Sequence, residues 1–576
     1  MAEGLRWVMP KSQQDTAEGI SRELGIHPIA ARVLIHRGYD NADSAKAFLN
    51  DDLASLPDPS KMKGLDAAVD RLCRAVVQKE KVTLWGDYDV DGVSSTALLS
   101  TFLRAVGGDI HTYIPHRLGE GYGLNMKAIE RIAGDGTRLL VTLDCGITSH
   151  AEISKANELG LQVIVVDHHA VPETMPPALA VLNPLQPGCE YPTKFLCAAG
   201  VAFNLAIGVR RGLRANGHFS DARPEPNLKE YMDLVALATV ADVVPLIGVN
   251  RLLVRHGLRE LSKAKRPGVK ALKYVSGLAG SDVTSGDVGF RLGPRINAAG
   301  RLDDAALGLK CLTAATYEAA LPLAKSLDAA NAERQAIEKQ ILEQALEQAE
   351  ARIAYGAKGL VLHAEGWHPG VVGIVASRVV ERFHRPTVMV GVWEGLGRGS
   401  ARSIERFHLY DALKLCSGHL AKFGGHKHAA GLSVTPDRLP GFVAAFEQVA
   451  GERLTEDDLV PRCKVDALVA AKELDVDSVE ALKVLAPFGA GNPEPVLATC
   501  GVVAAPKVVQ AKKEGMESHL KLQLEAAPHL DVIGFQLANR IGLTEGPIDL
   551  AFKASIDEWN GNKRVSLKLK DLRSAA

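Results

Sequence analysis

The chain has 576 residues, a formal net charge of −1 at pH 7 and 47% hydrophobic residues. This length predicts several domains, and the composition excludes a disordered chain. The near-zero charge neither favours nor excludes a nucleic-acid partner, because a neutral protein can still hold a basic groove.

Other features of the sequence indicate the cellular compartment of the protein. The longest apolar stretch, residues 197–209, is too short to span a bilayer and predicts a buried helix. The amino terminus has no apolar region typical of a secretory signal, so we expect a cytoplasmic protein that does not enter membranes. The eight cysteines include no Cys-x-x-Cys pair, which argues against a disulfide framework and against a thiolate zinc site.

The order of patterns along the chain predicts an α/β protein. Residues 1–60 contain short helical patterns that end in a turn-rich stretch. From 61 to 320, β-branched apolar runs alternate with helical patterns, which indicates parallel βαβ units in a doubly wound sheet. Residues 321–355 predict one long connecting helix, since 324–353 contains neither Gly nor Pro and repeats apolar residues at every fourth position.

Strand and helix patterns resume at 356–455 and predict a second, smaller α/β domain. Residues 456–576 contain short alternating segments, such as 519–526 and 548–559, which turn residues separate. This spacing is typical of a small β-barrel.

The stretch WGDYDVDGVSS, residues 85–95, places Asp87, Asp89 and Asp91 at alternate positions before a glycine. An EF-hand calcium loop begins in the same way. Its bidentate glutamate would fall at Leu98, however, and a β-branched run rather than a helix precedes the aspartates. The pattern instead indicates a strand, an acidic turn and a helix, and a capping aspartate would explain one acid of the three.

Two further predicted strands and one helical run also end in candidate ligands. These ligands are Asp144 after 138–143, then Asp167, His168 and His169 after 161–166, and Asp242 after the helical run. A single aspartate in such a place is usually a turn or cap residue. In open parallel sheets, however, ligands bind beyond the carboxyl ends of the strands, so four such groups in one domain predict a common crevice.

The candidate ligands predict a metal site. Crowded carboxylates repel one another unless cations neutralise them. Oxygen ligands with an imidazole and without a thiolate favour Mn²⁺ or Mg²⁺ over zinc. A carboxylate shared by two ions would hold them roughly 3.5–4 Å apart, the arrangement of two-metal phosphoester hydrolysis, and we expect this reaction.

Several glycine-containing segments carry side chains that suit phosphate binding. The residues are Arg117 in 116–123, Arg301 in 291–301, Arg398, Ser400 and Arg402 in 395–403, and Gly425 and His426 in 422–431. The competing interpretation is that these segments are ordinary turns whose arginines pair with surface acids.

Together these motifs resemble those of a known family. GDYDVDG, LDCG, VVDHH and VADVVP, followed by GRGSARS and FGGHKHAAG, are similar to the motifs of the DHH phosphoesterases that carry a DHHA1 domain. The similarity extends over nearly the whole chain, including APFGAGNPEPVL at 486–497. It is greatest to the bacterial exonucleases specific for single strands, whose C-terminal segment is an OB-fold.

The resemblance implies a role for each candidate ligand. One ion would be held by Asp89 and Asp144, with Asp87 nearby. The other ion would be held by Asp91, Asp144, His168 and Asp242. His169 would lie near the scissile phosphate, and Asp167 would orient the histidines.

The resemblance also implies 5′→3′ degradation of single-stranded DNA to 5′-mononucleotides, in DNA repair and recombination. The 5′-terminal phosphate would be received by Arg117, Arg301, Ser400 and Arg402. The OB-like segment would grip the strand, and its candidate contacts are Lys563 and Arg564 of a predicted turn and the aromatic residues Phe535, Phe552 and Trp559.

We expect a monomer whose partners are single-stranded DNA and, by resemblance, a helicase and a single-strand-binding protein. Two alternatives remain. A phosphodiesterase of short oligonucleotides or cyclic dinucleotides shares both catalytic domains but lacks the C-terminal β-rich segment. A non-catalytic replication scaffold would bind DNA without needing a complete set of ligands.

Overall fold

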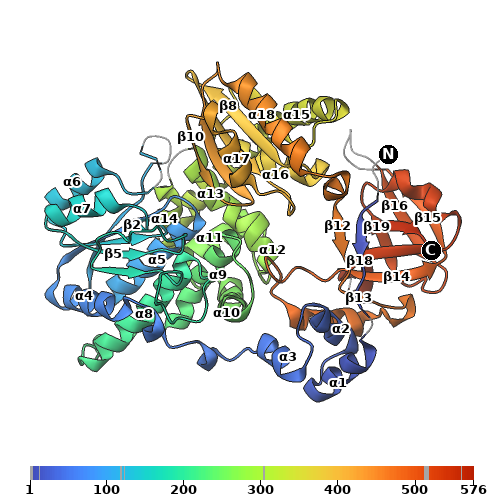
Figure 1. Ribbon diagram of the computed structural model, residues 1–576. Helices are drawn as coiled ribbons and strands as arrows, with labels where there is room; N and C mark the ends of the chain where they lie inside the picture. The colour runs from blue at the N-terminus through green and yellow to red at the C-terminus, as the bar shows by residue number, and fades with distance from the viewer. Residues whose placement is uncertain are drawn as a thin grey trace. The chain divides into compact units, whose positions relative to one another are not determined.

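The computed structural model describes residues 4–11, 13–116, 120–121, 123–302, 305–510, 518–559 and 561–575 (Figure 1). The chain divides into two compact units. The doubly wound unit comprises Ala47–Ala332 and, from much later in the chain, Ala486–Pro493. The composite unit comprises the chain up to Lys46, Glu333–Leu485 and the residues from Glu494 onward.

A five-stranded parallel sheet lies at the centre of the doubly wound unit, in the order β3-β2-β4-β5-β6. Its strands are β2 (Lys81–Gly86), β3 (Asp109–Tyr113), β4 (Leu139–Leu143), β5 (Gln162–Val166) and β6 (Ala180–Leu182). The helices around it are α4 (Leu65–Gln78), α5 (Val90–Ala105), α6 (Met126–Gly134), α7 (His150–Glu158) and α8 (Ala198–Ala215).

Both faces of this sheet are covered by helices, because successive side chains of a strand point to opposite faces. Leu84 of β2 and Val141 of β4 pack with α4, α5 and α8. Leu140 of β4 and Val163 of β5 pack with α6 and α7 on the other face (Figure 1). The predicted doubly wound sheet is confirmed.

A helical layer follows the sheet in the same unit. Its elements are α9 (Met232–Ala241), α10 (Gly248–Lys263), α11 (Pro267–Val275), α12 (Ser285–Asp287), the π-helix η4 (Val288–Leu292), α13 (Gly293–Leu302) and α14 (Ala306–Leu312). Helix α9 is mainly apolar, with Asp233 and Thr239 as its polar residues, and is buried along almost its whole length. It can therefore fix the position of Asp242, the residue that follows it.

The long helix α15 (Tyr317–Ala354) has 38 residues and contains the predicted stretch 324–353. It begins earlier than expected and includes Pro322. Proline normally ends a helical pattern because it lacks a backbone N–H donor. Here the helix starts five residues before the proline, where the hydroxyl of Thr316 accepts a hydrogen bond from the N–H of Ala319 at 3.2 Å.

The first domain of the composite unit contains a mixed sheet in the order β10-β11-β9-β8-β7. Its strands are β7 (Leu360–Glu365), β8 (Thr387–Trp393), β9 (Leu396–Arg402), β10 (Lys422–Gly425) and β11 (Ala429–Val434). Its helices are α16 (Val372–Phe383), α17 (Leu409–Leu415) and α18 (Leu439–Arg453). Helix α16 packs on one face of the sheet with the end of α15, and α17 and α18 pack on the other.

The C-terminal domain is a seven-stranded sheet in the order β13-β14-β18-β19-β17-β16-β15. Its strands are β13 (Ala467–Leu468), β14 (Leu497–Val502), β15 (Ala504–Val509), β16 (His519–Leu524), β17 (Asp531–Gly534), β18 (Ile548–Trp559) and β19 (Asn562–Ser574), and it carries helix α19 (Val476–Ala481). The predicted succession of a doubly wound domain, a smaller α/β domain and an OB-like β domain is confirmed.

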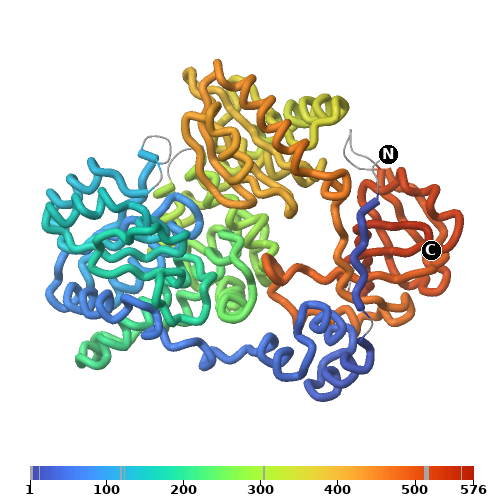
Figure 2. Tube along the Cα trace, in the orientation of Figure 1, coloured from blue at the N-terminus to red at the C-terminus, as the bar shows by residue number. Residues whose placement is uncertain are grey.

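The N-terminal segment contains a strand that the sequence analysis did not predict. Strand β1 (Arg6–Val8) pairs in parallel with β12 (Arg462–Lys464) and runs beside the C-terminal strands (Figure 2). Three residues are too few for a periodic pattern to be visible. The helices α1 (Gln14–Leu24), α2 (Pro28–His36) and α3 (Ala42–Leu49) follow, as the sequence predicts. Among the described residues, no helix has both the length and the apolar character needed to cross a bilayer.

A buried carboxylate holds this N-terminal strand. Asp571 of β19 accepts hydrogen bonds from the indole N–H of Trp7 at 2.8 Å and from the backbone N–H of Leu5 at 3.1 Å. Asp571→Ala should lower the free energy of unfolding by about 1–3 kcal/mol, because it leaves buried donors without an acceptor. Urea unfolding measures this change. Asp571→Asn keeps an acceptor oxygen and should lose less, whereas equal stability of all three proteins would contradict the role of this carboxylate.

Candidate active site

Three aspartates lie at the carboxyl edge of the sheet because each one extends a strand by one residue. The backbone N–H of Asp87 donates to the carbonyl of Leu143 at 3.1 Å, and that of Asp144 donates to Val166 at 3.0 Å. Asp167 continues the series one strand further, since its N–H donates to a carbonyl of β6 at 3.0 Å. The ladder between β2, β4, β5 and β6 therefore brings these acids together.

Asp89 and Asp91 are placed by helix termini. Asp89 caps α5, and its carboxylate accepts from the N–H groups of Asp91 at 2.9 Å and Gly92 at 3.1 Å. Both oxygens of Asp91 accept from the start of α8, from Ala198 at 2.6 Å and Ala199 at 2.8 Å. The positive end of a helix dipole thus faces each carboxylate.

Gly92 is required for this tight turn. A Cβ at this position would lie 2.5 Å from the backbone oxygen of Asp87, closer than real Cβ contacts. The glycine in GDYDVDG therefore permits the close approach of α5 to the end of β2 and brings Asp87 next to the helix N-terminus.

His168 lies at the centre of the acidic cluster. Its Nε2 atom is 3.2 Å from a carboxylate oxygen of Asp144, 3.6 Å from one of Asp242 and 3.7 Å from one of Asp91. Asp242 reaches this point from the C-terminal end of α9. The geometry groups the candidate ligands as Asp87, Asp89 and Asp144, as Asp91, His168 and Asp242, and as Asp144, His168 and His169.

A pocket of about 330 Å³ opens over this cluster within the doubly wound unit. Tyr88, Asn297 and Arg301 line it together with the acids. Arg301 is predicted from the sequence, whereas Asn297 is not. The side-chain oxygen of Asn297 accepts from the N–H of Val90 at 3.1 Å. The only signal for Asn297 was its place in the segment RLGPRINAAGR, one helical turn before Arg301.

Burial and mutual repulsion raise the pKa values of the acids. Burial is the larger cause and repulsion from neighbouring aspartates the second. The pKa of Asp91 rises to about 7 and that of Asp242 to about 8. The pKa of Asp144 also lies well above its ordinary value. Without cations the cluster therefore holds protons near neutral pH.

The two histidines shift in opposite directions. Burial, together with the charge of His169, lowers the pKa of His168 to about 4, so that its ring is neutral and can serve as a ligand at pH 7. Burial also disfavours protonated His169, but the hydrogen bond and charge of Asp167 outweigh burial and raise the pKa of His169 to about 9. His169 is therefore a candidate cation of the site, together with the guanidinium of Arg301.

Asp167 has a different environment from the other acids. It is completely buried, and its carboxylate accepts from the ring Nδ1 of His169 at 2.7 Å and from the N–H groups of Ile147, His168 and His169. These donors lower its pKa against the effect of burial. Asp167 thus holds the histidines in place, as an orienting residue would, and it does not line the pocket.

Two non-glycine residues beside the cluster have left-handed backbone conformations. Asp144 has a φ of 65°, and Val243, which follows Asp242, has a φ of 59°. Such conformations are uncommon outside glycine and most costly for β-branched residues, so the surrounding structure must enforce them. Strain of this kind is typical of functional sites.

The donor set fits divalent cations. Nε2 of His168 and Oδ2 of Asp242 are buried, and neither has a hydrogen-bond partner among the described residues. Buried polar atoms normally have partners, so these two point to a ligand. Carboxylate oxygens with one neutral imidazole suit Mn²⁺ or Mg²⁺.

Three of the predicted phosphate-binding residues of the composite unit lie on one strand. Arg398, Ser400 and Arg402 occupy alternate positions of β9 and therefore share one face. The guanidinium of Arg402 donates to the hydroxyl of Ser400 at 3.1 Å. A Cβ at Gly373, in the first turn of α16, would lie 2.8 Å from that hydroxyl. These groups and a helix N-terminus thus form a local site suited to an anion.

Other predicted contacts differ from expectation. Lys563 and Arg564 lie in strand β19, opposite Glu558 and Asp557, rather than in a turn. Phe552 is fully buried in the core, so it is not available for stacking.

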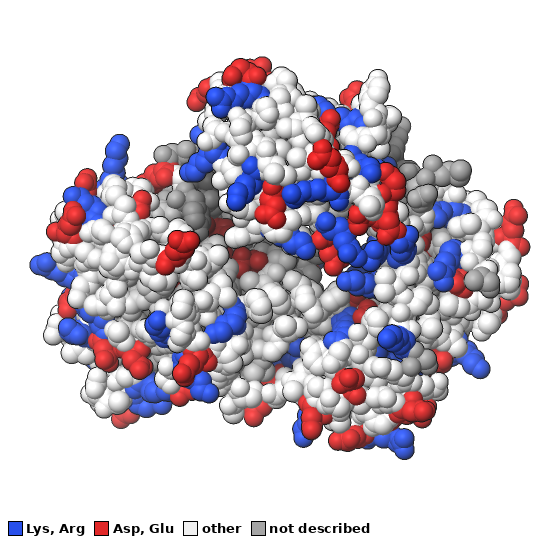
Figure 3. Space-filling model, in the orientation of Figure 1, with Lys and Arg blue, Asp and Glu red and all other residues white. Residues whose placement is uncertain are grey.

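The remaining predicted contacts are placed as follows. Phe535 is 53% exposed, and His426 is exposed at the end of β10 next to Gly425. Arg117 and the side chain of Trp559 lie outside the described residues. Lys and Arg are interspersed with Asp and Glu on the face drawn in Figure 3, so local basic groups coexist with the net charge of −1.

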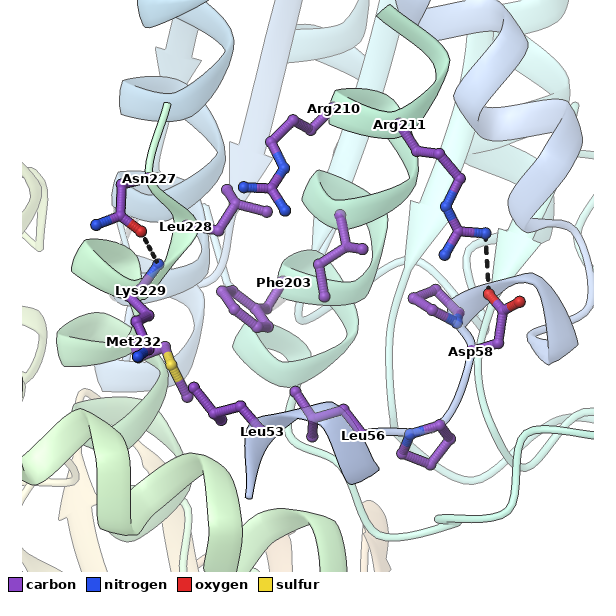
Figure 4. A pocket seen from close by; sticks show the side chains of 13 residues that line it. Leu53, Leu56, Asp58, Phe203, Arg210, Arg211, Asn227, Leu228, Lys229 and Met232 are labelled. Atoms are coloured by element: carbon purple, nitrogen blue, oxygen red, sulfur yellow. Dashed lines mark hydrogen bonds and ion pairs between the residues drawn. The ribbon is translucent and has the colours of Figure 1, made fainter. Parts of the chain in front are cut away.

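A second pocket of about 490 Å³ lies against α8, away from the acidic cluster, with which it shares no residue. Its floor is apolar and includes Phe203 and Met232, and two arginines stand at its rim (Figure 4). Arg211 pairs with Asp58 at 3.1 Å, and Arg210 pairs with Glu225 at 3.2 Å. Both guanidiniums therefore already have acidic partners.

Family comparisons agree with this architecture. The DHH family N-terminal domain matches residues 81–239, the DHHA1 domain matches 356–452 and the RecJ OB domain matches 465–571. The fold and the acidic site therefore define a DHH phosphoesterase with a DHHA1 domain and an OB domain.

Relatives that match most of this chain identify its family within the DHH phosphoesterases. The chain is 39% identical over 536 residues to the single-stranded-DNA-specific exonuclease RecJ of Dickeya dadantii, which covers 90% of this chain and 92% of that protein. It is 37% identical over 577 residues to RecJ of Bacillus subtilis, with 99% of this chain and 71% of that protein covered. The chain belongs to the RecJ family.

Solved structures of RecJ also match over the whole chain. RecJ from Thermus thermophilus in complex with Mn²⁺ matches with a TM-score of 0.84 and 34% identity, over 100% of this chain and 80% of that chain. The Mg²⁺ complex of RecJ from the same organism matches with a TM-score of 0.78 and 30% identity, over 100% and 79%.

The raised pKa of Asp242 predicts a pH-dependent stability in the absence of metal. Its pKa is about 8 in the folded chain against an ordinary 3.8, so its contribution to stability is complete below 3.8 and is lost as pH rises through about 8. Asp242→Asn should therefore raise the melting temperature in EDTA. The gain in melting temperature should grow as the pH rises from 3.8 to about 8.

Thermal melts over that pH range measure the effect, with the exposed Asp221→Asn in the same unit as the control. Excess Mn²⁺ should cancel or reverse the gain, because ligand binding stabilises only the chain that retains the site. A gain that does not change with pH would contradict the repulsion.

Proposed function

We propose that this chain is an exonuclease specific for single-stranded DNA, which acts in the 5′→3′ direction and releases 5′-mononucleotides. The observation that carries the proposal is the convergence of five aspartates and two histidines on one edge of the sheet. RecJ relatives named for single-stranded-DNA-specific exonuclease activity support the substrate, and RecJ structures in complex with Mn²⁺ and with Mg²⁺ support the cofactors.

The ligands divide into two sets in this proposal. Asp89 and Asp144, with Asp87 nearby, hold one Mn²⁺ or Mg²⁺ ion. Asp91, Asp144, His168 and Asp242 hold the other. With these residues as ligands, two bound ions would supply an activated water molecule and would neutralise negative charge on the phosphoryl oxygens.

The histidine pair contributes in two ways. His168 stays neutral, so its ring nitrogen is available as a ligand. Asp167 stabilises the protonated ring of His169. His169 faces the pocket and would donate a hydrogen bond to a phosphoryl oxygen of the scissile group. Asp167 acts through His169 and is a positioning residue.

Recognition of the DNA would use several groups. Arg301 lines the pocket over the cluster, and Arg117, Arg398, Ser400, Arg402, Gly425 and His426 are the other candidate contacts to the strand and its 5′-phosphate. The guanidiniums suit bidentate contacts with phosphate oxygens. In the C-terminal domain, Lys563 and Arg564 at the start of β19 remain candidate backbone contacts, and Phe535 is an exposed aromatic residue suited to stacking.

The cellular setting of the proposal is DNA repair and recombination. We infer a cytoplasmic monomer that acts on strands made accessible by a helicase or a single-strand-binding protein. The alternative activity on dinucleotides is less consistent with the C-terminal RecJ OB domain. Hydrolysis of dinucleotides but not of long single strands would favour that alternative.

The direction is tested with single strands labelled at the 5′ or the 3′ end. With Mn²⁺, early products from the 5′-labelled strand should be labelled mononucleotides, while the 3′ label should stay on long fragments. If labelled mononucleotides appear first from the 3′-labelled strand, the proposed direction is wrong. Tight DNA binding without cleavage would instead favour a scaffold.

Asp144 is the ligand common to both proposed ions. Asp144→Ala should lower the rate constant for hydrolysis by more than about a hundredfold, since bound metal supplies several kcal/mol of transition-state stabilisation. Single-turnover digestion of a saturating single strand measures the rate, and circular dichroism shows whether the variant is folded. A folded variant with nearly full activity would contradict the shared-ligand assignment.

Arg402 is expected to recognise the end of the strand. Arg402→Ala should weaken binding of 5′-phosphorylated strands by about 10–100-fold, since a hydrogen bond to a charged group contributes about 1.5–3 kcal/mol. Binding of 5′-hydroxyl strands should change little. Comparison of KM for the two strands measures the effect, with Arg453→Ala, an exposed arginine of α18, as the control. Equal losses for both strands would contradict a role at the 5′ end.

A further inference from the structure

A short segment from the C-terminal part of the chain belongs to the doubly wound unit. Residues Ala486–Pro493, here called the docking segment, pack with that unit, although Leu485 and Glu494 on either side belong to the composite unit (Figure 2). The proposed function gives this segment no role. Its sequence, APFGAGNP, is part of a motif that the sequence analysis noted without explaining.

Three backbone carbonyls of the docking segment are bound by the doubly wound unit. The backbone N–H of Leu246 donates to Ala490 at 2.7 Å. The guanidinium of Arg251, in α10, donates to Ala486 at 2.8 Å. The hydroxyl of Ser285, in α12, donates to Phe488 at 2.5 Å. Specific hydrogen bonds from three elements therefore hold the segment in one place.

The docking segment is itself a tight turn. The N–H of Gly489 donates to the carbonyl of Asn492 at 2.8 Å, and the N–H of Asn492 donates back to Gly489 at 3.2 Å. The buried side chain of Asn492 donates to the carbonyl of Pro487 at 2.8 Å and closes the turn from inside. The segment therefore has a defined shape rather than that of an extended linker.

The glycines of this turn allow close contact with the residues that follow Asp242. A Cβ at Gly489 would lie 2.7 Å from Cδ1 of Leu246. A Cβ at Gly491, whose φ is 70°, would lie 3.0 Å from Cβ and 3.4 Å from Cα of Pro245. The docking segment thus covers Pro245 and Leu246 with backbone, at a distance that side chains would prevent.

The covered residues lie in the loop 242–247, which connects α9 to α10. Asp242 begins this loop, and Val243 has the left-handed conformation that aims the chain away from α9. Leu246 lies four residues after Asp242. Since α9 fixes one end of the loop and the docking segment fixes the other, both contacts determine where the Asp242 carboxylate lies.

Asn250 connects this loop to a second ligand. Its buried side chain donates to the carbonyl of Pro245 at 3.0 Å and to that of Phe195 at 2.5 Å. Phe195 leads into Ala198 and Ala199, whose N–H groups hold Asp91. The loop under the docking segment is therefore tied to the backbone that positions Asp91.

We propose that the docking segment is a positioning element of the active site, which holds the 242–247 loop so that Asp242 can bind its metal ion. Residues carried by the C-terminal part of the chain thereby complete the catalytic unit. The inference rests on the proposed role of Asp242 as a ligand. It assigns no chemistry to the segment itself, which acts only through Asp242.

Gly491→Ala tests the proposal, because its methyl group would push on Pro245. Gly217→Ala is the matched control, since Gly217 lies in the same unit, has a φ of 68° and has nothing within 4 Å of an added Cβ. Both variants carry the cost of a left-handed alanine, but only one disturbs the loop. The readout is Mn²⁺ binding by the full-length chain without DNA, followed by the electron paramagnetic resonance signal of unbound Mn²⁺.

We expect Gly491→Ala to weaken one class of Mn²⁺ site by about tenfold or more, the usual effect of losing a group that orients a ligand. Gly217→Ala should bind Mn²⁺ as the unmodified chain does. The value of kcat should fall for Gly491→Ala at moderate Mn²⁺ and recover at high Mn²⁺, with little change in KM for DNA. Unchanged Mn²⁺ binding by folded Gly491→Ala would overturn the proposal.

A milder pair of variants covers the case in which Gly491→Ala does not fold. Ser285→Ala removes one hydrogen bond to the docking segment and should weaken Mn²⁺ binding in the same direction, whereas Ser285→Thr keeps the hydroxyl and should restore it. Equal binding by both would overturn the proposal. Asp242→Asn provides the reference. If Asp242→Asn leaves Mn²⁺ binding unchanged, Asp242 is not a ligand and the proposed function loses this assignment. If Asp242→Asn weakens Mn²⁺ binding but the variants at Gly491 and Ser285 do not, only the role of the docking segment is refuted.

Discussion

The structure depends on one electrostatic constraint: several carboxylates are buried within a few ångströms of one another and of a neutral imidazole. In a medium of low polarity such a cluster is unstable unless protons or cations neutralise it, and the raised pKa values of Asp91 and Asp242 reflect this. The fold offsets part of the cost with backbone N–H donors at the starts of α5 and α8. Among the described residues, buried atoms of His168 and Asp242 have no hydrogen-bond partner, and both residues belong to one group of candidate ligands for a divalent ion.

The site is built on rigid elements wherever a ligand comes from the sheet. Asp87 and Asp144 continue the hydrogen-bonded ladder, and Asp89 caps a buried helix, so their positions follow from the secondary structure. Asp242 is the exception, since it begins a loop with a strained residue at its second position. A ligand in such a place needs support from outside its own helix, and the docking segment supplies that support.

The surroundings of the two histidines give them different roles. Four donors bind the carboxylate of Asp167, which keeps His169 protonated, whereas burial and the charge of His169 keep His168 neutral. Two adjacent imidazoles therefore have different charges at one pH. One can bind a cation, and the other can face a phosphate, which is a division of roles that suits phosphodiester hydrolysis.

The sequence by itself determined the fold class and the metal-binding residue types, because strand-end acids and the alternation of strands and helices are local patterns. It placed the long helix within a few residues, but not the strand Arg6–Val8, whose partner lies more than four hundred residues away. It recognised Arg301 but not Asn297, since an amide in a helix has no pattern of its own. Only the tertiary structure decided that Phe552 is a core residue, that four donors surround the carboxylate of Asp167, and that residues 486–493 cover part of the 242–247 loop. Each of these depends on contacts between distant residues, which no local spacing encodes.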